Sequence, residues 1–87
     1  MSLYFVYLMS YSDKRGERWY CGYTNDPKRR EAEHRARDHR HWLTHMHVIA
    51  RFPALPRGRR DAMREERRVK RLNKVEKTML WIGGERP

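Results

Sequence analysis

The residue best suited to chemistry in this sequence is a carboxylate on the apolar face of a predicted helix. Glu66 falls on one stripe of a 3.6-residue period together with the apolar side chains of residues 62–72, which are Ala62, Met63, Val69 and Leu72. A carboxylate that faces a core costs free energy unless another group pairs with it. Two interpretations stay open: Glu66 forms a structural ion pair, or it lies at a cleft edge and binds a metal ion such as Mg²⁺.

Four further side chains have the types and spacing of a site. Arg30 and His34 lie four residues apart, so they share one face of a predicted helix. Tyr7 and Tyr20 lie in two apolar runs, and a register that pairs residue 7 with residue 20 places both rings on one face of a sheet. Each of these features also has a plain structural interpretation, since surface arginines and packed tyrosine pairs are common.

Two strands and a helix must position the first four of these residues. The apolar runs Leu3–Met9 and Trp19–Tyr23 predict strands, and the polar segment Ser10–Arg18 between them predicts the loop of a hairpin. Asp26 is suited to cap a helix that begins at Pro27 and extends to about residue 37.

The second half of the chain predicts one strand and two helices. Residues 44–52 alternate between apolar and polar side chains, which is typical of a strand with one buried face. After a turn at residues 53–58, Asp61 is expected to cap the helix at residues 62–72, and residues 74–82 form a third helix that Gly83 and Gly84 end. The sequence therefore predicts an α+β fold of order β-β-α-β-α-α, with a three-stranded antiparallel sheet flanked by three helices, in one domain at residues 1–84 followed by a tail at 85–87.

Charge points to a polyanionic partner. The 87 residues carry a formal net charge of +10, and residues 28–77 hold 17 of the 21 basic residues but only 7 of the 11 acidic ones. Most of the basic residues are arginine, whose planar fork of donors matches phosphate oxygens. Nucleic acid is the expected partner. No apolar run approaches a membrane span, and the single cysteine excludes an internal disulfide, so we expect a cytoplasmic protein.

Taken together, these residues resemble the GIY-YIG nuclease family, which is named for two short strand motifs. Here the motifs read Phe5-Val6-Tyr7 and Tyr20-Cys21-Gly22. The resemblance covers about residues 3–80, and Lys70, one turn after Glu66, looks like the small stand-alone branch of the family. The family's functional positions are matched by Tyr7, Tyr20, Gly22, Arg30, His34 and Glu66.

The resemblance implies a metal-dependent endonuclease that hydrolyses phosphodiester bonds in DNA, with RNA not excluded. It implies that Glu66 holds Mg²⁺ or Mn²⁺, that Arg30 holds the phosphate, and that Tyr7 orients or deprotonates the attacking water. Tyr20 and His34 are implied to position Tyr7 or the phosphate. The residues expected to contact nucleic acid are Arg29, Arg67, Lys70 and Arg71, and the protein is expected to act as a monomer or a homodimer.

Departures from the family pattern keep two other interpretations open. Phe5 and Val6 replace the Gly and Ile of the first motif, and Cys21 replaces the Ile of the second. One alternative is therefore a catalytically silent module that keeps the fold and binds DNA or RNA. The other is a structural or partner-binding domain in which the tyrosines and Glu66 only pack and pair.

A cluster of histidines raises the question of a zinc site. The four residues are His39, His41, His45 and His47, and the last two share one face of the predicted third strand. We expect solvated histidines beside a polyanion groove rather than zinc ligands, because their charge would rise below about pH 6.5 and strengthen binding.

Overall fold

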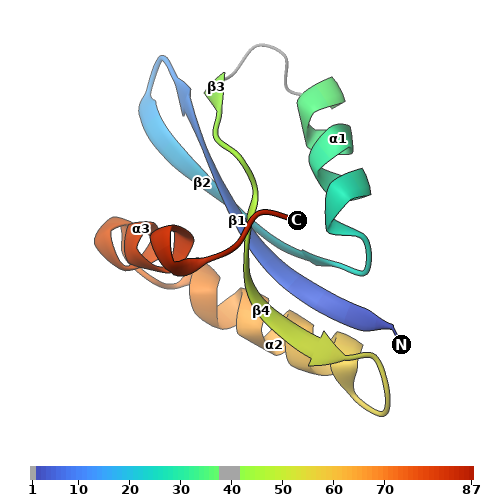
Figure 1. Ribbon diagram of the computed structural model, residues 1–87. Coiled ribbons are helices and arrows are strands. Elements are labelled where there is room, and N and C mark those ends of the chain that lie inside the picture. Colours follow the sequence, from blue (N-terminus) through green and yellow to red (C-terminus); the bar gives the residue numbers. More distant parts are fainter. Residues whose placement is uncertain (1, 38–41) are drawn as a thin grey trace.

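A computed structural model describes residues 2–37 and 42–87. Its elements are β1 Leu3–Asp13, β2 Gly16–Thr24, α1 Pro27–Arg37, β3 Trp42–Leu43, β4 His47–Pro53, α2 Gly58–Lys70 and α3 Lys74–Gly83 (Figure 1). The short β3 and the longer β4 both pair with β1, which also pairs with β2, so the antiparallel sheet is three strands wide with β1 in the middle. The predicted α+β fold and its β-β-α-β-α-α order are confirmed, with the third strand in two pieces.

The hairpin differs from its prediction. Residues 10–18 were expected to form a loop, but β1 continues to Asp13 and β2 begins at Gly16, so only two residues turn the chain. Gly16 has a φ of 109°, a conformation that favours glycine. The outer part of this hairpin exposes both of its faces to water, so polar residues can occupy its paired strands. The loop prediction is wrong because it interpreted these polar residues as a loop.

The register of this hairpin places both motif tyrosines on one face. Tyr7 pairs with Gly22, and Met9 pairs with Tyr20. This register is two residues away from the expected pairing of Tyr7 with Tyr20. A shift of two preserves the face on which each side chain lies. Tyr7, Met9 and Met46 form a buried cluster against which Tyr20 packs, so the predicted shared face is correct although the partners are not.

The two faces of the sheet meet different helices. Cys21 alternates with the motif tyrosines and lies 3.8 Å from the backbone oxygen of Glu66, so its face packs on α2. His34 of α1 contacts Tyr7 on the opposite face. Because α1 has no buried residue, polar contacts attach it to the sheet: besides His34, the Glu31 carboxylate accepts a 2.7 Å hydrogen bond from the backbone N–H of Met46.

The helix starts show which capping signals were correct. At α1, the Arg29 N–H donates to the Asp26 carboxylate at 3.2 Å, which confirms the predicted cap. The cap predicted at Asp61 is wrong, because α2 begins at Gly58 with Arg57 as its N-cap residue. An acidic side chain in the first turn interacts favourably with the helix dipole even when it is not the cap residue. An acid in the first turn and an acid at the N-cap position therefore look alike in sequence. At α3, Asn73 and Glu76 form a reciprocal capping box.

The last helix and the chain end lie along β4. Trp81 stacks on His47 with ring centroids 4.0 Å apart, and its indole N–H donates to the backbone oxygen of His45 at 3.0 Å. His47 is therefore half-buried against α3, not solvated as expected, whereas His45 is exposed. His39 and His41 lie outside the described residues. In the segment expected to be a tail, Glu85 pairs with Val48 through two backbone hydrogen bonds.

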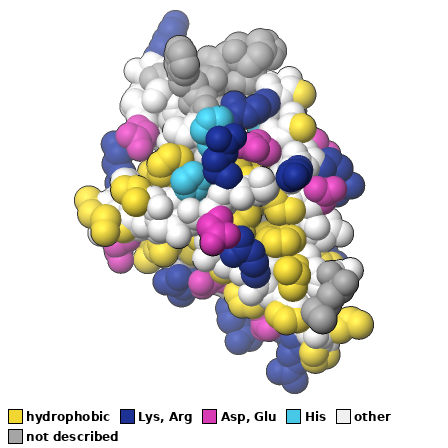
Figure 2. Space-filling view, viewed as in Figure 1, with side chains coloured by type: hydrophobic (Ala, Val, Ile, Leu, Met, Phe, Trp, Pro, Cys, Tyr) yellow, Lys and Arg dark blue, Asp and Glu magenta, His cyan; other side chains and the backbone are white. Residues whose placement is uncertain are grey.

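The surface of the fold and the length of its helices each show one further feature. Apolar side chains of α3 remain at the surface on the left of the molecule (Figure 2), and the most exposed of them are Val75, Met79 and Ile82. Among the residues that the structure describes, no helix is long and apolar enough to cross a membrane.

Candidate active site

A cleft of about 440 Å³ opens where the edge strand β2 meets α1 and α2. Tyr7 enters it from β1, Arg30 from α1 and Glu66 from α2, so three elements bring together three of the five predicted catalytic residues. Gly22 and Arg29 also line the cleft. The motifs that are distant in sequence therefore meet at one place.

Gly22 lets Tyr7 reach this cleft from the central strand. A β-carbon built on Gly22 would lie 2.5 Å from the Tyr7 hydroxyl oxygen and within 3 Å of two carbons of the ring. The ring of Tyr7 thus lies across the neighbouring strand at the one residue that has no side chain there. The glycine of the second motif is required by this close approach.

Replacing Gly22 with alanine tests this role. The added methyl group must displace the Tyr7 ring, so the cleavage that the resemblance implies is expected to fall about a hundredfold, as for a misplacement of about 1 Å in a reacting group. The fold should lose about 1–3 kcal/mol through overpacking. Gly83→Ala is the matched control, because a β-carbon at Gly83 meets nothing within 4 Å. Turnover and thermal unfolding of both variants would be measured, and a fully active Gly22→Ala protein would contradict the packing argument.

His34 and Tyr20 hold Tyr7 from outside the cleft. The Tyr7 hydroxyl lies 2.9 Å from His34 Nε2 and is hydrogen-bonded to it. The imidazole of His34 stacks on Tyr20 with ring centroids 5.1 Å apart, and Tyr20 stacks in turn on Tyr11 at 4.5 Å. Two stacked tyrosine rings therefore support the imidazole that orients the Tyr7 hydroxyl.

Burial keeps Tyr7 in its neutral form. Desolvation raises the pKa of Tyr7 to about 12, while the nearby Arg30 guanidinium acts to lower it. In the free protein the hydroxyl is therefore protonated at neutral pH and serves as a hydrogen-bonding group. Burial also raises the pKa of the Cys21 thiol to about 12, so the motif cysteine is a packing residue and not a thiolate nucleophile.

Arg30 has an unused donor. Its Nε atom is buried and has no hydrogen-bond partner among residues 2–37 and 42–87, while its Nη1 lies 3.6 Å from the Glu33 carboxylate. Buried donors in native proteins are normally satisfied, so this Nε departs from the usual pattern. The Arg30 side chain as a whole lines the cleft and is 38% exposed, so it presents accessible surface to a ligand there. A guanidinium in this position is suited to a phosphate oxygen.

The Glu66 carboxylate is partly shielded and paired. Its side chain is 17% exposed, and its Oε1 atom lies 3.0 Å from the ammonium of Lys70, one turn further along α2. The sequence left two interpretations of Glu66 open, a structural ion pair and a metal ligand. This contact shows that the ion pair exists. The same carboxylate also lines the cleft, so the pair does not remove it from the site.

The residues present fit a divalent cation held by one carboxylate. Glu66 is the acidic residue that lines the cleft, and no group of three or more His, Cys, Asp or Glu side chains gathers in the described ranges, either in the cleft or outside it. Mg²⁺ commonly binds through one or two carboxylates and keeps several waters, with substrate phosphate completing its coordination. An open cleft with one carboxylate beside a phosphate-binding arginine suits that mode.

The residues expected to contact nucleic acid are placed in different surroundings. Arg29 lines the cleft, whereas Lys70 does not line it but pairs with Glu66, which does. Arg67 lines a second, larger depression beside the cleft, whereas Arg71 is the exposed C-cap residue of α2 and lines neither.

Sequence reasoning missed Arg59, which also lines the cleft and donates from Nε to the Tyr23 hydroxyl at 3.5 Å. It precedes Glu66 by seven residues, which is two helical turns and therefore the same face of α2. That spacing was a usable signal. Tyr23 also lines the cleft, and its position directly after the second motif was the only sequence signal that it belongs to the site.

Comparison with known proteins adds one match to this geometry. Residues 3–79 match the GIY-YIG catalytic domain, which includes every residue placed in the cleft. Neither the curated proteins nor the solved structures contain a significant match to the chain. Since the match covers nearly the whole sequence and the fold has the expected order of elements, the protein belongs to the GIY-YIG catalytic domain family.

Proposed function

We propose that this protein is a divalent-metal-dependent endonuclease that hydrolyses phosphodiester bonds in DNA. The family match supports a nuclease and a nucleic-acid substrate. The observation that carries the finer proposal is the meeting of three residues in one cleft: Arg30 with its guanidinium, Glu66 with its carboxylate and Tyr7 with its hydroxyl. A phosphate binder, a metal ligand and a group that orients water are the parts that this hydrolysis needs.

Arg30 binds the scissile phosphate in this proposal. Its guanidinium donates to phosphate oxygens and offsets the negative charge that develops as the phosphorus is attacked. Its contact with Glu33 is long and partly exposed, so phosphate can replace it at little cost.

Tyr7 orients the attacking water. With its proton directed to His34 Nε2, the phenolic oxygen is free to accept a hydrogen bond from water. Deprotonation of that water then requires a proton path, and the Tyr7–His34 hydrogen bond provides one to the imidazole. Tyr20 keeps the imidazole in place through ring stacking.

Glu66 holds the cation, which we propose to be Mg²⁺ or Mn²⁺. When bound, such an ion polarises the phosphate and stabilises the leaving oxygen. Lys70 neutralises Glu66 in the free protein and lies close enough to contact substrate phosphate once the carboxylate is engaged.

A plasmid-nicking assay tests the proposal. Supercoiled DNA incubated with the protein and Mg²⁺ is expected to be nicked, and EDTA is expected to stop the reaction. Labelled single-stranded, branched and RNA substrates should be run beside the plasmid, because the DNA assignment requires DNA to be cut in preference to RNA. Absence of Mg²⁺-dependent cleavage on every substrate would overturn the proposal.

The alternative is a silent module that binds DNA or RNA without turnover. The Glu66–Lys70 ion pair is the observation that favours it, because a neutralised carboxylate needs no metal. This alternative predicts salt-sensitive binding together with no metal-dependent strand breakage, so the same assay separates the two functions.

A further inference from the structure

A second depression lies beside the cleft, and five of its nine lining residues are arginine. We define the arginine groove by Arg57, Arg59, Arg60, Arg64 and Arg67, with Tyr4 and Met63 among its other lining residues. Its volume is about 730 Å³, and it shares Tyr4 and Arg59 with the cleft. The two depressions therefore adjoin.

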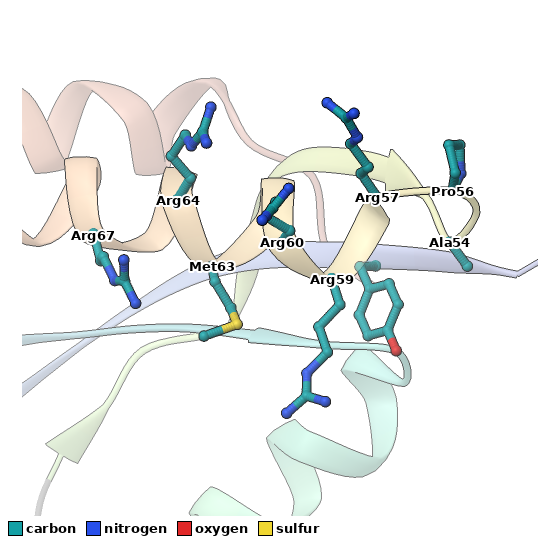
Figure 3. Close-up of a pocket in the computed structure, with 9 residues that line it drawn as sticks. Ala54, Pro56, Arg57, Arg59, Arg60, Met63, Arg64 and Arg67 are labelled. Carbon is teal, nitrogen blue, oxygen red and sulfur yellow. The ribbon is translucent and has the colours of Figure 1, made fainter.

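The guanidiniums are arranged along both sides of α2 (Figure 3). Arg57 and Arg64 project from one side of the helix, Arg59 and Arg67 project from the other with Met63, and Arg60 lies between them. At a rise of 1.5 Å per residue, residues 57–67 extend over about 15 Å. This length corresponds to about four phosphates of one strand along a duplex axis.

The groove arginines lack the carboxylate partners that six other basic residues have. Within residues 2–37 and 42–87, carboxylates pair with Arg30, Arg35, Arg51, Arg68, Lys70 and Lys74. Over the same ranges Arg57, Arg60, Arg64 and Arg67 make no ion pair, and no acidic side chain lines the groove. The two neighbouring acids of α2, Asp61 and Glu65, line a different depression together with Arg68, and Arg64 lines both depressions.

Five like charges within three turns of one helix repel each other. An anion that contacts several of these arginines offsets their repulsion. A chain of phosphates can do so along the whole array, because about four phosphates of one strand span its length. Basic side chains also gather along the lower rim of the molecule, where Figure 1 places α2 (Figure 2).

We propose that the arginine groove binds the phosphodiester backbone of the substrate strand on one side of the scissile phosphate. The proposal rests on the proposed nuclease function for the position of the scissile phosphate, at Arg30 and Glu66 in the adjoining cleft. Continuity through Tyr4 and Arg59 lets one strand pass from the cleft into the groove. Contacts to phosphate fix the position of a strand without reading its sequence, so this site confers register and not base specificity.

The test compares two doubly substituted proteins of equal charge. Arg60→Gln/Arg64→Gln removes two groove arginines, and Arg68→Gln/Lys74→Gln removes two basic residues that pair with Glu65 and Glu17 outside the groove. Binding of a labelled single strand and of its duplex would be measured by fluorescence anisotropy in EDTA over a range of salt, after circular dichroism has confirmed folding. EDTA keeps the substrate intact.

We expect the groove variant to bind about tenfold more weakly or worse at low salt. Its salt slope should be smaller by about 1.8 for the duplex or about 1.4 for the single strand, which is the effect of two lost phosphate contacts. The control variant should keep the parental slope. Loss on the single strand alone would assign the groove to an unpaired strand, and loss on the duplex alone or on both would assign it to a strand within duplex DNA.

Equal loss in both variants would show that only net charge matters and would overturn the proposal, as would parental binding by the groove variant. Cleavage assays separate this outcome from failure of the nuclease proposal. If the parent cuts DNA and the groove variant still binds like the parent, the groove is wrong and the nuclease stands. If nothing is cut but the groove variant loses affinity and slope, the groove remains a strand-binding site and the nuclease proposal fails.

Discussion

Glu66→Gln is expected to abolish cleavage while leaving nucleic-acid binding within about twofold of the parent. The substitution removes the carboxylate that we propose as the metal ligand, and Lewis-acid stabilisation worth several kcal/mol corresponds to a loss of about a thousandfold or more. Few phosphate contacts are lost, so affinity is preserved. Turnover and anisotropy on the same substrate measure the two effects separately.

Glu65→Gln is the matched control for this experiment. Glu65 is the residue that precedes Glu66 on α2, and it forms an ion pair with Arg68 outside the cleft. Removing its charge should leave cleavage unchanged. The variant Glu66→Gln should also stay folded, because Lys70 is 56% exposed and its ion pair contributes at most about 1 kcal/mol. Near-parental turnover by Glu66→Gln would move the metal site elsewhere.

Tyr7→Phe is expected to lower kcat by about 10²–10⁴, the range that acid–base groups contribute. The ring that packs with Met9 and Met46 is kept, so the fold should be retained. What disappears is the hydroxyl that bonds to His34 at 2.9 Å. Tyr11→Phe removes a hydroxyl from the same strand away from the cleft and serves as the control. Single-turnover rates on a saturating substrate would reveal the loss, and equal rates in both variants would refute the role of Tyr7.

The pKa of Tyr7 gives this variant a second signature. Since burial raises that pKa from 10.0 to about 12, the folded state prefers the neutral phenol. The resulting stabilisation is fully present below pH 10 and is lost as the pH rises through about 12. Between these values the parent should lose more stability than Tyr7→Phe does. Denaturant unfolding of both proteins at pH 8 and at about pH 11 would test this, and parallel losses would contradict it.

Local patterns predicted most of the fold. Seven consecutive apolar residues at Leu3–Met9 identified the central strand, and Asp26 with Pro27 identified the start of α1 correctly. The hairpin was harder, because its register depends on a two-residue turn within polar sequence. Gly16 was the available signal, since a residue with positive φ beside a tight turn is commonly glycine. The face of the sheet on which each side chain lies was easier to predict than the register, because an error of two residues in the register does not change the face.

The site was predicted less completely than the fold. Glu66 was found because a charge on an apolar stripe violates the pattern of its helix. The resemblance assigned Tyr7 and Arg30, and the structure places them in one cleft with Glu66. Arg59 and the other groove arginines do not break the apolar pattern of the helix, because arginine on an exposed helix face is ordinary. Their significance lies in the absence of carboxylate partners, which only three-dimensional contacts reveal.

One rigid helix carries both the proposed metal ligand and the arginines of the groove. Along α2, Glu66 lies about 13 Å from the level of Arg57, a separation set by helical rise and not by the packing of separate parts. Under the two proposals, this helix sets the distance along a nucleic-acid strand between the part that the groove binds and the bond that is cut. Under the same proposals, lengthening or shortening α2 would change that distance in steps of the helical pitch.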